Sequence, residues 1–302
     1  MLEIHPEREA KRIQGFLKAA LERLHKDGVV IGLSGGLNSS TVAFLAKEAL
    51  GPHRIFSLIL PEKDSDPKNI EHGREVAKIL GVSFREIDIT PILERFGVYG
   101  LFVERLPQSR RLLEGFLKRF QMSSLFLKGL FSFYPHTTAL KTKFFSKYKN
   151  QALALATGKA RLRMVFLYYY ARLKNYLVLG TSDKTEWSIG YYDGDVITDI
   201  QPLLHLYKTQ IRELSRFCGV IEEIVEKPSS GDFFGRGIPN EAVIGLPYET
   251  IDSILFCLER GDPTDRISGL LGVETEKIEG IRGLLAFEKT RRSLPLSLLG
   301  SL

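Results

Sequence analysis

The sequence predicts an α/β fold, a doubly wound parallel sheet flanked by helices. Short apolar runs alternate along the chain with stretches of helical periodicity, and the connections between them are short. This alternation is typical of a parallel sheet that is covered on both faces. A Ser/Gly-rich loop follows the first apolar run directly, at residues 32–40. Ligands of such sheets bind beyond the carboxyl ends of the strands, so we expect this loop to lie at the binding edge.

The first ninety residues supply three of the expected strands and the helices between them. Gly51, Pro61 and Gly81 stand where elements of the pattern end, as glycine and proline commonly do. In chain order the expected elements are a helix at 7–26, a strand at 29–31, a helix at 41–50, a strand at 55–60, a helix at 67–80 and a strand at 82–89.

Residues 91–150 break this pattern, because aromatic side chains are interleaved there with Arg and Lys. Helical spacing at 112–127 favours an inserted helical hairpin that covers the sheet or a partner subunit. As alternatives, the segment could bind nucleic acid by stacking on bases and neutralising phosphates, with the strongest pattern at 141–149, or form a lid over a nucleotide. We therefore predict a single domain, residues 1–302, with a basic, aromatic insert at 91–150.

The pattern of strands and helices resumes after this insert. A strong helix is expected at 151–173, and a buried strand at 175–180 runs into the polar sequence 181–186. Residues 247–287 read as helices with apolar faces. The fourth strand therefore brings a second polar strand end to the edge where the Ser/Gly loop is expected.

Composition bounds the class of protein. The chain has 302 residues, 44% hydrophobic and 26% charged, which is ordinary for a water-soluble globular protein. Its net charge of +6 favours an anionic partner without naming one. A charged start and the lack of an apolar run near 20 residues predict a cytoplasmic protein with no membrane segment. Cys218 and Cys257 have no metal-site or disulfide spacing, so we expect buried thiols.

The Ser/Gly loop has the features of an anion site. It lies between a strand and a helix N-terminus, where backbone N–H groups lack partners and the helix dipole is positive. Gly35 and Gly36 would let the backbone approach a ligand, and Ser34, Ser39 and Ser40 add hydroxyl donors. No Gly-Lys-Ser/Thr closes the loop, and its glycine spacing differs from the dinucleotide fingerprint. The simpler alternative is a glycine-rich turn before a capped helix.

The loop resembles the pyrophosphate-binding loop of the ATP pyrophosphatases, Ser-Gly-Gly-x-Asp-Ser, with Asn38 in place of Asp. These enzymes belong to the adenine nucleotide alpha hydrolase superfamily. Within it, the order of motifs resembles the ammonia-dependent NAD synthetases. The motifs that carry this resemblance are Ala160-Arg161-Leu162-Arg163-Met164, Leu179-Gly180-Thr181-Ser182-Asp183-Lys184-Thr185-Glu186, Gly190-Tyr191, Asp199-Ile200-Gln201-Pro202-Leu203, Leu206-Tyr207-Lys208-Thr209-Gln210 and Lys227-Pro228-Ser229-Ser230.

The resemblance implies an ATP-dependent amide synthesis in which ATP adenylates the carboxylate of deamido-NAD, pyrophosphate leaves, and free ammonia displaces AMP to give NAD. It implies a homodimer with the deamido-NAD site at the subunit contact. Arg161 and Asp199 would bind deamido-NAD, Asn38 and Glu186 would hold Mg²⁺, and Ser34 and Lys208 are the catalytic candidates. The ATP contacts that the resemblance implies are Gly32, Leu33, Ser34, Gly35, Gly36, Leu37, Asn38, Ser39, Ser40, Thr181, Lys208 and Ser229.

Each of these residues also has an ordinary structural interpretation. Glu186 could be a first-turn helix acid, Lys208 a solvated helix residue, and Thr181 an N-cap. Asn38 is a weaker magnesium ligand than the usual carboxylate, and a lysine expected in the loop 190–199 is absent. The alternative hypotheses are therefore a divergent ATP pyrophosphatase that adenylates another acid or a nucleic-acid base, and a catalytically weak nucleotide-binding protein.

Overall fold

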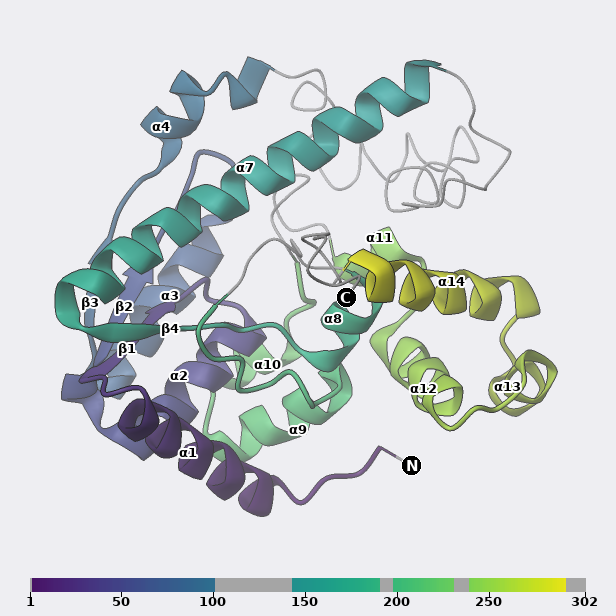
Figure 1. Cartoon of the computed structure of the whole chain (residues 1–302), viewed down its shortest axis with the longest axis horizontal. Helices are drawn as coiled ribbons and strands as arrows, with labels where there is room; N and C mark the ends of the chain where they lie inside the picture. Colours follow the sequence, from purple (N-terminus) through teal and green to yellow (C-terminus); the bar gives the residue numbers. More distant parts are fainter. Residues whose placement is uncertain (1, 101–142, 191–197, 231–238, 292–302) are drawn as a thin grey trace, which may run out of the picture.

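The computed structural model describes residues 2–100, 143–190, 198–230 and 239–291, which surround a four-stranded parallel sheet (Figure 1). The strands lie in the order β3-β2-β1-β4, so β1 has neighbours on both sides. Their bounds are Gly28–Gly32 for β1, Ile55–Ile59 for β2, Ser83–Glu86 for β3 and Tyr176–Leu179 for β4. This arrangement confirms the predicted fold class.

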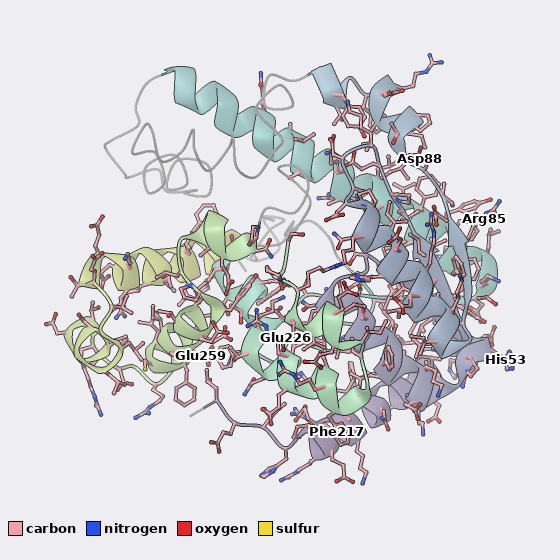
Figure 2. All side chains as sticks on the ribbon, turned by 180° about the vertical axis from the view of Figure 1, so that it is seen from behind. His53, Arg85, Asp88, Phe217, Glu226 and Glu259 are labelled. Carbon is pink, nitrogen blue, oxygen red and sulfur yellow. The ribbon has the colours of Figure 1, made fainter. Side chains whose placement is uncertain are left out.

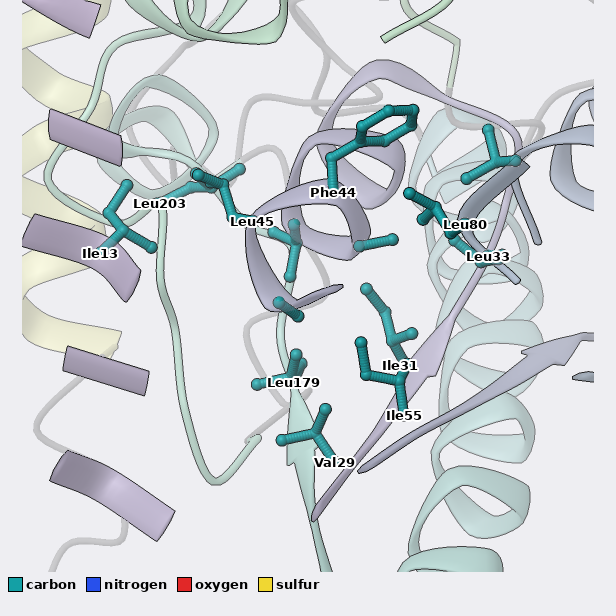
Figure 3. Packing of buried hydrophobic residues seen from close by; sticks show 14 of the residues in the cluster. Ile13, Val29, Ile31, Leu33, Phe44, Leu45, Ile55, Leu80, Leu179 and Leu203 are labelled. Carbon is teal, nitrogen blue, oxygen red and sulfur yellow. The ribbon is translucent and has the colours of Figure 1, made fainter. Parts of the chain in front are cut away.

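Side chains of β1 alternate between two cores. Val30 pairs with Phe56 of β2 and with Val178 of β4. Val29 and Ile31 belong to the larger core, shown in Figure 3, whereas Val30 belongs to a second core on the opposite face. Because successive strand residues point to opposite faces, a strand buried on both sides is apolar throughout. This is why residues 29–31 read as a continuous apolar run.

Helices cover both faces of the sheet. The larger core includes side chains of the helices on one face, and α7 (Lys143–Lys174) contributes Leu162, Leu167 and Ala171 to the other core. The helices of the larger core are α1 (Pro6–Arg23), α2 (Leu37–Leu50), α3 (Pro67–Leu80), α9 (Lys208–Cys218) and α10 (Glu222–Glu226). Local sequence sets their ends: in α3, the Asp66 carboxylate accepts a bond from the Lys68 backbone N–H, and Gly81 adopts the left-handed C-terminal conformation.

The C-terminal helices and α8 (Lys184–Ile189) form a third core beside the sheet layer (Figure 1). Its largest fully buried side chain is that of Tyr248. The C-terminal helices are α11 (Asn240–Ile244), α12 (Tyr248–Glu259), α13 (Thr264–Leu271) and α14 (Thr275–Arg291). The remaining short elements are η1 (Pro52–Arg54), α4 (Thr90–Arg95) and η2 (Val98–Gly100). The helices predicted at 247–287 are thereby confirmed.

Some boundaries differ from the prediction. Helix α2 begins at Leu37 rather than Thr41, so residues 37–40 form its first turn. Strand β3 spans only Ser83–Glu86, because it is the exposed edge strand, with Arg85 pointing outward (Figure 2). Helix α7 starts at Lys143, so the boundary expected at residue 150 falls inside a continuous helix.

Several predictions concern parts of the chain that are not described. Residues 101–142 lie outside the described ranges, and with them the helix expected at 112–127. The insert therefore stays a prediction, as does the single domain. Cys257 is buried and Cys218 is half-buried, and both are free thiols. Within the described ranges, no helix is both long and apolar enough to cross a membrane.

Candidate active site

A cavity of about 370 Å³ opens at the carboxyl ends of β1, β2 and β4. β1 lies between β2 and β4, so the chain leaves this edge in two directions and forms the crevice where such sheets bind ligands. The lining is apolar near the sheet and α7 and polar around the Ser/Gly loop. Its apolar residues include Leu58, Leu60, Met164 and Leu167, and its polar residues include Ser34, Asn38, Ser39, Asn69, Arg163, Thr181, Glu186, Lys208, Lys227, Ser229 and Asn240.

The Ser/Gly loop forms one wall of this cavity. The hydroxyls of Ser34 and Ser39 are 3.0 Å apart, and the Ser34 backbone N–H donates to Ser39 Oγ at 3.3 Å. Gly36 is the residue just before α2, so the helix N-terminus faces the cavity. Of the predicted loop residues, Gly32, Leu33, Ser34, Gly36, Leu37, Asn38 and Ser39 line the cavity.

Gly35 and Ser40 do not line the cavity, but their contacts hold the loop in place. Gly35 has φ +71°, and a Cβ built there would lie 1.9 Å from the backbone oxygen of Asn69 in α3. Ser40 is fully buried, and its hydroxyl donates to Gly36 O at 2.8 Å. Gly35 is therefore required for packing against α3, rather than for close approach to a ligand.

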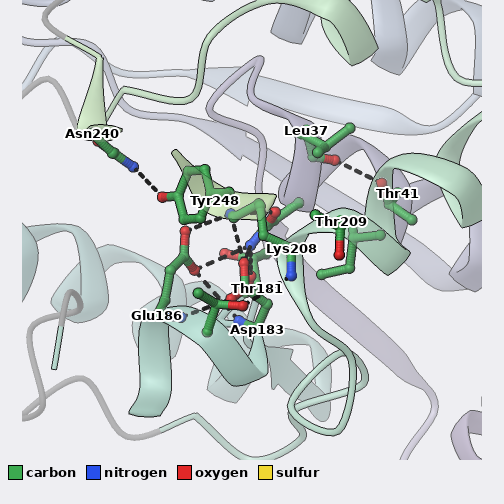
Figure 4. Close-up of polar contacts among 12 residues, drawn as sticks. Leu37, Thr41, Thr181, Asp183, Glu186, Lys208, Thr209, Asn240 and Tyr248 are labelled. Atoms are coloured by element: carbon green, nitrogen blue, oxygen red, sulfur yellow. Dashed lines mark hydrogen bonds and ion pairs between the residues drawn. The ribbon is translucent and has the colours of Figure 1, made fainter. Parts of the chain in front are cut away.

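Lys208 is buried at the start of α9, and its ammonium contacts side chains of α2 and α8 (Figure 4). Nζ is 2.6 Å from Asp183 Oδ2, 2.6 Å from Glu186 Oε1 and 2.9 Å from Asn38 Oδ1. Asp183 is the N-cap of α8, and Glu186 completes its capping box. These contacts exclude a solvated Lys208. The N-cap of α8 is Asp183 rather than Thr181, because the Asp183 carboxylate accepts from the Glu186 backbone N–H.

The charges of Lys208, Asp183 and Glu186 shift the pKa values within this cluster. Burial alone would lower the pKa of the Lys208 ammonium, but the carboxylates of Asp183 and Glu186 outweigh it and raise that pKa. Burial, together with the charge of Asp183, raises the pKa of Glu186 to about 7, although Lys208 opposes this shift. Perturbed groups in a cleft are typical of functional sites.

Asn38 bonds to the same cluster from the first turn of α2. Its Nδ2 donates to Thr181 O at 2.8 Å, to Asp183 Oδ2 at 2.9 Å and to Glu186 Oε2 at 3.1 Å. The acceptors on one side and the Lys208 ammonium on the other fix which end of the amide faces which group. Asn38 therefore joins α2, the end of β4 and α8 at the cavity.

Comparison with known proteins decides the family. The family model for NAD synthase matches residues 9–127 and 130–295, which is most of the chain. The chain belongs to the NAD synthase family. Its relatives in this family include the NH(3)-dependent NAD(+) synthetase of Methanocaldococcus jannaschii, 34% identical over 286 residues that cover 94% of this chain and 93% of the relative. That of Thermotoga maritima is 35% identical and covers 93% of this chain and 96% of the relative.

Solved structures agree with this assignment to the NAD synthase family. An NMN synthetase from Francisella tularensis superposes with a TM-score of 0.68 at 26% identity, covering 98% of this chain and 99% of the other. An NH3-dependent NAD synthetase from Campylobacter jejuni has a TM-score of 0.64 at 24% identity, covering 98% and 100%, and shows the shared fold. The family match also spans most of residues 91–150, the predicted insert.

The other predicted site residues separate into two groups. Thr181 and Ser229 line the cavity, whereas Arg161 and Asp199 do not. Arg161 lies on an exposed face of α7. Asp199 accepts a bond from the Val178 backbone N–H at 2.8 Å and one from the Tyr168 hydroxyl at 3.2 Å. The structure thus brings both metal candidates and all the ATP candidates except Gly35 and Ser40 to one cavity, and Arg161 and Asp199 lie outside its lining.

A buried ionic cluster fixes α7 against the end of β2. The Lys159 ammonium lies 3.0 Å from Glu62 Oε1 and 3.1 Å from Asp64 Oδ2, and all three side chains are buried. The Tyr99 hydroxyl donates to Glu62 Oε2 at 2.6 Å. One turn further along α7, Arg163 lines the cavity and donates to Leu60 O at 3.3 Å. The cluster therefore holds two walls of the cavity together.

Replacing Lys159 by methionine should lower the free energy of unfolding by about 3–5 kcal/mol, because two buried carboxylates would lose their cation. Arg74→Met is the matched control, since Arg74 pairs with Glu86 at 2.6 Å on the surface. The free energy of unfolding of Arg74→Met should be close to that of the wild type. Urea titration measures the stability of both variants, and equal unfolding midpoints for Lys159→Met and wild type would contradict the predicted role of the cluster.

Asp252 of α12 joins α8 to the start of α9, where Lys208 lies. Its fully buried carboxylate accepts bonds from Thr185 Oγ1 at 2.5 Å, from the Thr209 backbone N–H at 2.9 Å and from Thr209 Oγ1 at 2.8 Å. Thr185 Oγ1 accepts from the Lys208 backbone N–H at 3.0 Å. Burial raises the pKa of Asp252 to about 6, although the bonds from Thr185 and Thr209 oppose this.

The raised pKa of Asp252 predicts a pH effect on stability. The ordinary pKa is 3.8, so between pH 4 and 6 the folded state holds the proton more tightly than the unfolded state. The contribution of Asp252 to stability therefore falls as pH rises through this window and levels off above it. Relative to Asp252→Asn, the wild type should lose about 3 kcal/mol of unfolding free energy across the window. Parallel pH curves for the two proteins, from urea unfolding, would contradict this.

Sequence reasoning missed several residues of the site. Asp183 could have been found, because Asp three residues before Glu is the signature of a capping box. Arg163 and Lys227 lie within quoted motifs but received no role. Lys159 gave no signal, since a lysine in an amphipathic helix usually faces solvent.

Proposed function

We propose that this NAD synthase family member is an ammonia-dependent NAD synthetase. A carboxylate oxygen of deamido-NAD bonds to the α-phosphorus of ATP, and pyrophosphate leaves with the electrons of the broken P–O bond. Ammonia then attacks the acyl carbon, loses a proton to solvent, and AMP leaves. The observation that carries the proposal is the Ser/Gly loop, which faces a cavity at the carboxyl ends of β1, β2 and β4 in a chain that matches the family along its length.

The cavity residues support the ATP part of the proposal. Ser34, Ser39 and the N-terminus of α2 offer hydroxyl and backbone donors for the β and γ phosphates. Lys208 supplies the positive charge that the leaving pyrophosphate requires. Thr181 and Ser229 add hydroxyls to the cavity wall, and Leu60 and Met164 offer an apolar surface for the base. These proposed roles assign a part of ATP to each group of residues that lines the cavity.

Mg²⁺ enters the proposal as the counter-ion of ATP. As they lie, Asn38 and Glu186 do not fit a cation held by protein alone, because the Lys208 ammonium and the Asn38 amide already satisfy the oxygens around them. Among the residues that the structure describes, no group of three or more His, Cys, Asp or Glu could hold a metal ion. The proposed metal contacts of Asn38 and Glu186 therefore depend on the nucleotide.

The acceptor site and the homodimer form a linked part of the proposal. Val165, Tyr169 and Leu173 are 63%, 58% and 64% exposed and follow Arg161 at four-residue spacing on α7. An exposed apolar stripe of this kind suits contact with a second subunit. If the acceptor binds at that contact, Arg161 stands where a second subunit would complete its site. A cytoplasmic location stays a sequence-based prediction.

The test is an assay with ATP, magnesium, ammonium and deamido-NAD. We expect NAD and AMP in equal amounts, with ammonium preferred to glutamine as nitrogen donor. Nicotinic acid mononucleotide is the comparison acceptor, because a similar fold carries the name NMN synthetase. Faster AMP release with the mononucleotide would overturn the assignment of deamido-NAD, and no AMP with any acid would overturn the synthetase assignment.

A further inference from the structure

Lys227 lies in the cavity wall beside the Ser/Gly loop, directly after α10. Its ammonium donates to Gly35 O at 3.0 Å, to Asn69 Oδ1, and to His72 Nδ1 at 3.2 Å. His72 is 3% exposed, and its Nε2 faces Glu223 at 3.6 Å. Three elements therefore hold the ammonium in one place: the loop itself, α3, and the segment that leads to Ser229.

The environments of Lys227 and Lys208 differ. Lys208 faces the carboxylates of Asp183 and Glu186, so these two negative charges of α8 and its N-cap partly offset its positive charge. Three of the groups that fix Lys227 are a carbonyl, an amide and an imidazole nitrogen, which are uncharged when His72 Nδ1 accepts. Bonding to Gly35 O also places this ammonium next to the backbone that leads into Gly36 and α2.

We propose that Lys227 is a phosphate-binding residue of the ATP site, which supplies positive charge beside the Ser/Gly loop in addition to that of Lys208. Its ligand class is pyrophosphate, whether as the β and γ phosphates of ATP or as the free product. A preorganised cation in a partly buried site attracts an anion more strongly than one in water, because it needs no reorganisation. This inference rests on the proposed function, since it assigns a residue to the same nucleotide site.

The experiment compares binding of pyrophosphate with binding of AMP by calorimetry. Lys227→Met should weaken pyrophosphate binding at least tenfold and change AMP binding less than twofold, because AMP lacks the β and γ phosphates that the proposal places beside Lys227. Lys227→Arg, which keeps the charge, should recover part of the loss. Lys68→Met is the matched control: Lys68 pairs with Glu223 on the surface nearby, and this variant should bind both ligands as the wild type does.

Two results would overturn the inference. Unchanged pyrophosphate binding in Lys227→Met would show that Lys227 does not contact phosphate. Equal losses of affinity for pyrophosphate and AMP would show that Lys227 only supports the fold. Failure of the proposed function is seen separately in the wild type. A wild type that makes NAD while Lys227→Met binds pyrophosphate normally would refute this inference alone, whereas a wild type that neither makes NAD nor binds pyrophosphate would refute both.

Discussion

Replacing Lys208 by methionine is expected to lower kcat/KM for NAD synthesis by about 1,000-fold. The variant removes the positive charge that faces both the cavity and the carboxylates of Asp183 and Glu186. Those two carboxylates would then share a buried space without a cation, so the free energy of unfolding should also fall by about 3–5 kcal/mol. Steady-state kinetics and urea unfolding measure the two effects.

Arg212→Met is the control for the Lys208 variant. Arg212 lies one turn later on the same helix, and its ion pair with Glu249 has the same length, 2.6 Å, but lies at the surface. We expect kinetics within twofold of wild type and nearly unchanged stability. If Lys208→Met were as active as Arg212→Met, the proposed role of Lys208 would be wrong.

The Gly35→Ala variant should bind ATP at least tenfold more weakly than wild type and lose about 2–4 kcal/mol of stability. Alanine is strained at φ +71°, and its Cβ would lie 1.9 Å from the Asn69 backbone oxygen. Either the loop or α3 must move, and both line the cavity. Calorimetry with ATP and urea unfolding measure the two effects.

Gly81→Ala separates backbone strain from the close approach at Gly35. Gly81 has φ +65° in the left-handed conformation, but a Cβ there meets no atom within 4 Å. This control should lose only about 1 kcal/mol of stability and bind ATP normally. Equal losses in Gly35→Ala and Gly81→Ala would show that the packing of the loop on α3 does not matter.

Local patterns predicted the parts of the fold that depend on nearby residues. The apolar runs, their spacing and the loop at the strand end together indicated a parallel sheet with its binding edge at residues 32–40. The structure confirms the sheet and places Ser34, Asn38 and Ser39 on the cavity. Register between strands and the exact helix ends were not predictable, since they depend on contacts between distant segments.

Buried and half-buried charges show where sequence reasoning stops. Lys159, Lys208 and Lys227 all occur in polar or amphipathic surroundings that usually indicate solvent exposure. Lys159 contacts Glu62, Lys208 contacts Glu186 and Lys227 contacts Gly35, at 97, 22 and 192 residues along the chain. Periodicity alone gives no sign of these pairs. The resemblance supplied a role for Lys208, and only the folded arrangement shows what Lys159 and Lys227 contact.

The most direct measurement follows one oxygen atom through the reaction. Deamido-NAD labelled with ¹⁸O in its carboxylate is incubated with ATP, magnesium and ammonium, and the AMP is examined by mass spectrometry. If the acid attacks the α-phosphorus, as proposed here, each AMP phosphate will carry one labelled oxygen. Unlabelled AMP, or ADP and phosphate in place of AMP and pyrophosphate, would contradict adenylation at this site.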